Sequence, residues 1–105
     1  MAAGTAALEV RDNTAAQRFE VGSGSEISYA TYEISPGSIV FTHTRVPEAL
    51  RGKGIATRLV QAALASARER GLAVVPRCAM FVTYMKRHPD SQDLLSAEGR
   101  RLIAL

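Results

Sequence analysis

The sequence predicts an α+β fold: a mostly antiparallel meander of four strands, followed by a β-α-β crossover and C-terminal helices. Three observations predict it. Up to residue 46, apolar and polar residues alternate in short segments separated by turn-forming residues. From residue 55 the apolar residues recur every three or four positions, which is the spacing of a helix that faces a core. A continuous apolar run at 72–75 is typical of a strand buried on both faces.

Four segments carry the strand pattern. They are Leu8–Asp12, Gln17–Val21, Ile27–Ile34 and Ile39–Val46. Gly, Ser, Asn, Asp and Pro fill the short stretches between them, and these residues favour turns. Because strands joined by short turns pair antiparallel, the four segments should form a meander.

A helix is expected at Ile55–Arg70, with Gly71 at the position of a helix C-cap. The strand Leu72–Val75 that follows should lie parallel to the fourth strand, which makes the connection a right-handed crossover. A second helix is expected at Ala79–Arg87, before Pro89, and one more short helix at Gln92–Leu105.

Length and composition indicate a single domain, residues 1–105. The chain is 47% hydrophobic and 22% charged, as in ordinary globular proteins. No apolar run approaches the roughly 20 residues of a membrane span, and no signal-peptide pattern opens the chain. A lone cysteine, Cys78, fits a reducing compartment, and two histidines with one cysteine are too few for a structural zinc site. We therefore expect a soluble cytoplasmic protein with no membrane partner and no metal site.

Positive charge is concentrated in one segment. The net charge of the chain is +3, but nine basic and two acidic residues give residues 45–87 a formal charge of +7. Such a segment attracts an anion: a phosphorylated cofactor, a nucleic acid or an acidic surface. Arg68 and Arg70, late in the expected helix, are interpreted as ordinary solvated helix charges.

The stretch Arg51–Ala56, with Gly52 and Gly54, is the most informative motif. Glycines let a ligand approach the backbone, and successive N–H groups at a helix start can cradle a phosphate. A Walker A loop is excluded because Gly54, not Ser or Thr, follows Lys53. The dinucleotide fingerprint is excluded because Thr57 replaces its third glycine. Taken alone, the stretch is equally compatible with a plain turn before a helix.

The pattern Arg51-x-x-Gly54-x-Ala56, after a strand and opening a helix, resembles motif A of the GNAT N-acetyltransferase superfamily. The segment Leu72–Arg87 stands where that superfamily has motif B. Together with Pro76-x-Cys78 and His88-Pro89, the chain resembles a minimal, acetyltransferase-like branch of about 100 residues. The likeness runs from about residue 8 to 95 and implies a three-layer α/β arrangement.

The resemblance implies acetyl-CoA as cofactor. The backbone of Val46 would pair with the pantetheine arm. The pyrophosphate would lie among Arg51, Gly52, Lys53, Gly54, Ile55 and Ala56, with Thr57 next in the first helical turn. Lys86 or Arg87 would reach the 3′-phosphate or the adenine. Members of the superfamily usually have one or two helices between their first two strands, where this chain has only a turn. The acceptor site would therefore be open, or completed by a partner.

Three residues are candidates for chemistry. Strict alternation places His43 on the strand face of Ile39, Phe41 and Arg45, where it is either a general base or a half-buried histidine bonded to backbone. Cys78, near a helix start, is either a nucleophile that is transiently acetylated or a small buried apolar residue. Tyr84 stands in the helix in which many superfamily members carry the tyrosine that protonates the leaving thiolate.

The expected function is acetyl transfer from acetyl-CoA to an amine that the sequence does not identify, by direct transfer. Two alternatives stay open. A non-catalytic CoA-binding module is suggested by the missing helices of the acceptor wall. A small basic nucleic-acid-binding domain is suggested by the segment 45–87, but that segment lacks interleaved aromatic residues, and the chain has no Trp. The sequence does not indicate the oligomeric state.

Overall fold

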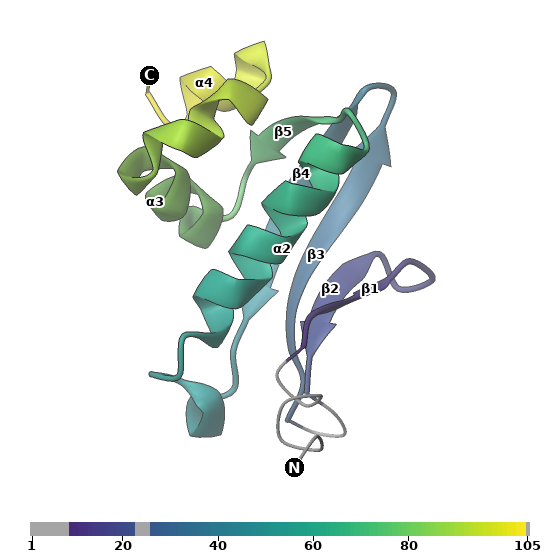
Figure 1. Ribbon diagram of the computed structural model, residues 1–105, viewed down its shortest axis with the longest axis vertical. Helices are drawn as coiled ribbons and strands as arrows, with labels where there is room; N and C mark the ends of the chain where they lie inside the picture. The colour runs from purple at the N-terminus through teal and green to yellow at the C-terminus, as the bar shows by residue number, and fades with distance from the viewer. Residues whose placement is uncertain (1–8, 23–25, 105) are drawn as a thin grey trace.

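The computed structural model describes residues 9–22 and 26–104. It contains one five-stranded sheet in the order β1-β2-β3-β4-β5 (Figure 1). The strands are β1 (Arg11–Asn13), β2 (Arg18–Val21), β3 (Ser28–Ser35), β4 (Ser38–Arg45) and β5 (Ala73–Pro76). Neighbours from β1 to β4 pair antiparallel and β5 pairs parallel with β4, which confirms the predicted meander and crossover.

The first strand is displaced from its predicted place at Leu8–Asp12. Leu8 lies outside the described residues, and β1 begins at Arg11 and continues through Asn13. The cause is the partner strand: β2 has only four residues, and its register pairs Arg11 with Glu20 and Asn13 with Arg18. The turn therefore begins one residue later than expected.

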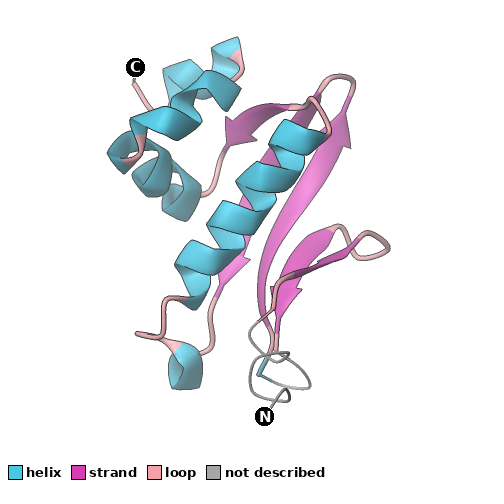
Figure 2. Cartoon of the chain, viewed as in Figure 1, coloured by secondary structure: helices cyan, strands magenta, loops and turns pink. Residues whose placement is uncertain are grey.

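Helix α2 (Ile55–Glu69) connects β4 to β5 and lies across one face of the sheet (Figures 1 and 2). Its buried residues follow the predicted spacing. They are Ile55, Leu59, Val60, Ala63, Leu64 and Ala67. The helix stops where the sequence indicates, because Gly71 adopts a φ of +66° and turns the chain toward β5.

Helix α3 (Ala79–Arg87) packs on the same face of the sheet, beside α2. Phe81 of α3 stacks on Phe41 of β4 with ring centroids 4.2 Å apart, and both side chains are fully buried. This contact fixes the start of α3 against the middle of β4. The described helices are all too short or too polar to cross a membrane.

The single helix predicted at Gln92–Leu105 is wrong. The chain forms a 3-10 helix, η3 (Pro89–Leu94), and then a separate helix, α4 (Ala97–Leu102). They are separated because Leu95 forms a parallel bridge with Val74 of β5, and Ser96 then caps α4 by accepting a hydrogen bond from the Gly99 amide. Gly99 lies so close to β5 that a Cβ there would stand 2.6 Å from the Val74 carbonyl oxygen.

One polar contact ties the edge of the sheet together. The Tyr32 hydroxyl of β3 donates to Asp12 Oδ1 of β1 at 2.6 Å, and Arg70, at the end of α2, lies 3.7 Å from the same carboxylate. Burial and the hydrogen bond to Asp12 raise the pKa of Tyr32 to about 12. The phenol therefore stays protonated to a higher pH than the phenol of an ordinary tyrosine.

Candidate active site

The loop between β4 and α2 has the backbone geometry that the glycine motif predicts. After a short 3-10 helix, η2 (Glu48–Leu50), Gly52 and Gly54 adopt φ values of +82° and +74°. No described atom lies within 4 Å of the place where a Cβ of either residue would stand. Gly54 is the N-cap of α2 and provides no side-chain hydrogen bond to it. The loop thus presents bare backbone at the positive end of a fifteen-residue helix.

A cavity of about 770 Å³ lies against this loop and the end of β4. Most residues predicted for the site line it. They are His43, Val46, Arg51, Gly52, Gly54, Ile55, Ala56 and Thr57. Lys53 is exposed but lies outside the lining. The Ile55 side chain belongs to the core, so this residue can offer only its backbone to a ligand.

The cavity adjoins a stretch of β4 that β5 does not pair with. Pairing between the two strands ends at Phe41 and Pro76, and the Arg77 amide then donates to the Phe41 carbonyl at 2.9 Å. Among the described residues, no strand pairs with this edge of β4 from residue 42 to 45. An open strand edge offers backbone donors and acceptors to an extended ligand.

Thr44 and Cys78 meet across the gap where the two strands separate. Thr44 Oγ1 lies 3.1 Å from Cys78 Sγ, and both residues are half-buried. Cys78 is the N-cap of α3, with extended backbone, and its carbonyl accepts the first bond of that helix, from Val82. The thiol thus stands at a helix start, as the sequence indicates.

A β-bulge lies in β4 just before this gap. Phe41 pairs with Tyr32, but His43 pairs with Thr31, so Thr42 is an extra residue in the strand. A bulge of this kind reverses the alternation of all residues that follow it. The second half of β4 therefore presents its side chains in the opposite phase from the first half.

The prediction that His43 and Arg45 share a face with Ile39 and Phe41 is wrong. Ile39 and Phe41 are buried under the helices, whereas His43 and Arg45 are exposed on the opposite face. The His43 ring lies 6.2 Å from the ring of Tyr29, which is the cross-strand partner of Arg45. His43 nevertheless lines the cavity, because it stands at the end of β4 where the cavity begins.

Tyr84 lies in a second cavity, of about 490 Å³, between α2 and α3. The two cavities share Ala56, Thr57 and Met80 in their linings. The Tyr84 ring stacks on His88 with centroids 3.9 Å apart. Arg87 lines this second cavity as well.

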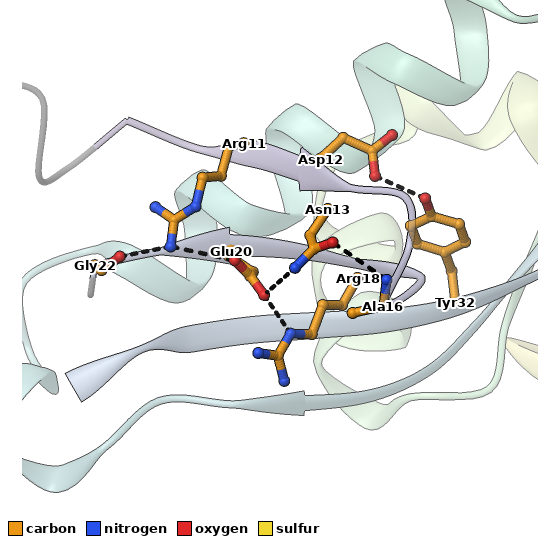
Figure 3. A network of polar contacts seen from close by, with 8 residues as sticks. All are labelled: Arg11, Asp12, Asn13, Ala16, Arg18, Glu20, Gly22 and Tyr32. Carbon is orange, nitrogen blue, oxygen red and sulfur yellow. Dashed lines mark hydrogen bonds and ion pairs between the residues drawn. The ribbon is translucent and has the colours of Figure 1, made fainter. Parts of the chain in front are cut away.

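A buried carboxylate, that of Glu20, lies at the centre of a network of polar contacts (Figure 3). Register places Glu20 on the same sheet face as His43. Glu20 is 3% exposed and is held by Arg18 Nε, by Asn13 Nδ2 at 3.0 Å and by Arg11 Nη2 at 3.2 Å. Burial raises the pKa of the Glu20 carboxyl, but the hydrogen bonds from Arg18 and Asn13 and the two positive charges outweigh burial and hold the pKa below its ordinary value. The alternation in the strand segment Gln17–Val21 places Arg18 and Glu20 on one face, but it does not indicate that the carboxylate is buried.

Sequence reasoning missed two features of the site. Thr44 was not singled out, because its partner Cys78 is 34 residues away and the bulge changes the face on which Thr44 stands. Met80, which is 38% exposed and lines both cavities, had the spacing of a core residue. In residues 9–22 and 26–104, no group of three or more potential metal ligands comes together.

Comparison with known proteins gives two matches. A family model described as GCN5-related N-acetyl-transferase matches residues 18–94. Among solved structures, a GCN5-like protein from Staphylococcus aureus, determined by NMR in solution, is similar with a TM-score of 0.70. The two chains share 24% sequence identity, over 86% of this chain and 89% of the other, and at this identity the likeness shows the fold alone. No curated protein matches this sequence.

Proposed function

The chain belongs to the GCN5-related N-acetyltransferase family, whose members are acyltransferases, and we propose that it takes acetyl groups from acetyl-CoA and passes them directly to an amine. The observation that carries the choice of donor is the glycine loop before α2. Its two left-handed glycines face open space, and the first amides of the helix stand behind them. This geometry suits a diphosphate.

The residues present fit such a cofactor in three further respects. Arg51 and Lys53 are exposed beside the loop and would offset the charge of the phosphates. The unpaired edge of β4 suits the amides of a pantetheine arm. Arg87 lines the adjoining cavity whereas Lys86 does not, which favours Arg87 for the 3′-phosphate or adenine end.

Arg51 also contacts the backbone of the strand end that the pantetheine arm would pair with. Its Nε donates to the Val46 carbonyl at 3.2 Å. The resemblance to the superfamily implies that Val46 pairs with the cofactor through its backbone. If the cofactor paired with the Val46 carbonyl, Arg51 would have to give up its hydrogen bond to that carbonyl. The guanidinium of Arg51 could then bind a phosphate of the cofactor.

Bound acetyl-CoA supplies an acetyl group already activated as a thioester. The chain must then remove a proton from the attacking ammonium and return one to the departing sulfur. His43 is our candidate for the first task, because its exposed ring stands at the edge of the cavity, beside the open end of β4. Tyr84 is our candidate for the second, by donation of its phenolic proton.

Cys78 has a structural role in direct transfer. Its contact with Thr44 bridges the gap between β4 and the start of α3, and so fixes the width of the opening. The competing role, acetylation of the thiol before transfer to the amine, calls for the same position at a helix start and is separated by experiment below.

The proposal is tested by thermal shift followed by detection of free thiol. Saturating acetyl-CoA should raise the melting temperature, because a ligand that binds only the native state stabilises it, and an oligonucleotide should not. A panel of amines should then release CoA. A melting temperature that acetyl-CoA leaves unchanged contradicts the proposal, and a shift without CoA release from any amine supports the non-catalytic module instead.

His43→Gln and Tyr84→Phe test the two proton-transfer roles. Each should lower kcat by about a hundredfold, the usual worth of a general acid or base, with little change in the Kd of acetyl-CoA. Equal kcat in variant and parent would remove the corresponding role.

A further inference from the structure

The sheet face opposite the helices carries an ordered array of polar side chains across β2, β3 and β4. Register places these side chains in two adjacent rows. One row contains Glu20, Tyr29 and Arg45, and the other contains Arg18, Thr31 and His43. Residues in one row stand about 5 Å apart from strand to strand, and the rows stand about 7 Å apart along the strands. The bulge at Thr42 is what brings His43 and Arg45 into this array.

Arg18 is held in the array with its outer edge available. Its Nε binds the buried Glu20 carboxylate, and Figure 3 shows its two terminal nitrogens directed away from that carboxylate. Its Cζ lies 4.8 Å from the centre of the Tyr29 ring, so the guanidinium is stacked on an aromatic face. A guanidinium fixed in this way presents a planar pair of donors with little further loss of side-chain freedom.

The face has a positive excess. Arg11 and Arg18 pair with one buried carboxylate, that of Glu20, and Arg45 stands in the same row beyond Tyr29. These four groups carry a formal charge of +2. Glu33 is the other acidic residue of β2–β4 on this face, and it stands one row further toward the turn between β3 and β4. Arg45 is exposed and forms no hydrogen bond or ion pair with any described residue.

We propose that the amine acceptor carries an anionic group, a carboxylate or a phosphate, and that Arg18 and Arg45 bind this group on the open sheet face. The inference rests on the proposed function, because it takes His43 as the base that receives the ammonium proton. His43 and Arg18 are two strands apart in one row, and Arg45 is in the next row on the same strand as His43. An acceptor whose amine lies at His43 would therefore extend its other end along the same face toward Arg45 or Arg18.

The positive charge of this sheet face favours an acceptor with an anionic group over a polyamine. A second ammonium group would meet Arg18 and Arg45, and like charges at such distances repel. Carboxylates and phosphates instead accept paired hydrogen bonds from a guanidinium, which are the stronger, charge-assisted kind. The ring of Tyr29, half-buried beneath Arg18, provides an apolar floor for the body of the acceptor.

The test compares acceptors that differ only in the anion. γ-Aminobutyrate is assayed against n-butylamine, and phosphoethanolamine against ethanolamine, by CoA release at saturating acetyl-CoA. The anionic member of at least one pair should have a kcat/KM about tenfold higher. The pair that shows the preference identifies carboxylate or phosphate as the group bound.

Arg45→Gln is the main variant, since the Arg45 side chain has no hydrogen-bond or ion-pair partner among residues 9–22 and 26–104. It should remove most of the preference by raising the KM of the anionic acceptor, while the KM of acetyl-CoA and the rate with the neutral amine stay unchanged. Arg45→Lys, which keeps the charge, should retain part of the preference. Arg101→Gln, an exposed arginine on α4, is the matched control and should behave like the parent.

Failure of this inference is distinct from failure of the proposed function. If acetyl-CoA shifts the melting temperature and neutral amines release CoA as fast as anionic ones, the acceptor inference is overturned and the acetyltransferase stands. A rise in the KM of acetyl-CoA in Arg45→Gln also overturns it, because Arg45 would then serve the cofactor. If no amine reacts, the amide resonances of Thr31 and His43 decide: they must move more with γ-aminobutyrate or phosphoethanolamine than with the neutral amines, or the inference fails.

Discussion

Thr44 Oγ1 and Cys78 Sγ lie 3.1 Å apart, at the point where β4 and β5 separate. The contact joins the strand that lies along the proposed pantetheine path to the N-cap residue of α3. It therefore bears on both roles considered for the thiol. A serine at 78 keeps a hydrogen-bonding group at this point and an alanine does not.

We expect Cys78→Ser to retain transfer within severalfold of the parent, as direct transfer requires. Cys78→Ala should lose the contact with Thr44 and about 1 kcal/mol of stability or less, because bonds to sulfur are weak. Urea denaturation and CoA release measure the two effects. Thr44→Val, which removes the same contact from the other side, is the control for stability.

Intact-protein mass spectrometry after incubation with acetyl-CoA alone provides the decisive readout for Cys78. Direct transfer predicts no acetylated protein. An acetyl group on Cys78 in the parent, together with an inactive Cys78→Ser variant, would show instead that transfer passes through the thiol.

Gly54→Ala should weaken acetyl-CoA binding in addition to lowering the stability of the fold. Alanine at a φ of +74° costs about 1–2 kcal/mol, and the loop amides would shift to relieve the strain. We expect the Kd of acetyl-CoA to rise about tenfold or more, measured by calorimetry.

Gly37 offers a matched control for this variant. It has a φ of +76°, and no described atom lies within 4 Å of the place of its Cβ, but it stands in the turn between β3 and β4. Gly37→Ala should lose similar stability and leave the Kd unchanged. An equal Kd in both variants would show that the loop does not hold the cofactor.

Glu20 should make the fold sensitive to acid. Its pKa in the folded state lies below the ordinary value of 4.5, so its ionised form stabilises the fold at neutral pH. This contribution is complete above pH 4.5 and is lost as the pH falls through the lower, folded-state pKa. Glu20→Gln should lose about 2 kcal/mol at pH 7 and show a shallower decline in acid, measured by urea unfolding at several pH values. Glu33→Gln, exposed on the same face, should keep the parent's decline, and an unchanged decline in Glu20→Gln would contradict the assignment.

Tyr32 should make the fold sensitive to alkali. Its folded-state pKa of about 12 exceeds the ordinary value of 10.0, so the protonated phenol stabilises the fold below pH 10. That contribution declines as the pH rises from 10 toward 12. Tyr32→Phe, which loses the bond to Asp12, should be about 1 kcal/mol less stable at pH 7 and lack this part of the alkaline decline. Spectrophotometric titration of the tyrosines in the parent and the variant would show whether Tyr32 is the tyrosine that ionises at the highest pH.

The sequence predicts the elements whose conformation is set by their own residues and not by a distant partner. α2 follows from the spacing of apolar residues between Ile55 and Ala67, and its end follows from the backbone freedom of Gly71. The glycine loop follows equally well, since its conformation is set by Gly52 and Gly54 themselves.

Features that depend on a distant partner were not predictable. The bulge at Thr42 is invisible in Thr-His-Thr, which continues a regular alternation, and only the register with β3 reveals it. The tail is divided by a bridge from Leu95 to Val74, although Ser96 is a residue type that often begins a helix. The side of the sheet on which His43 lies could therefore not be predicted from the sequence alone.

The extra residue in β4 also divides this eight-residue strand into two parts. Packing of the core limits the residues allowed in the first part, and contact with the acceptor limits those in the second. Before Thr42, a substitution is tolerated only if the new side chain fills the space against Phe81 and the helices. After it, Arg45 can be exchanged for another polar residue without disturbing that packing, so acceptor preference can drift between relatives while the interior stays the same. Relatives that differ in acceptor should therefore vary most at position 45, and hardly at 39 and 41.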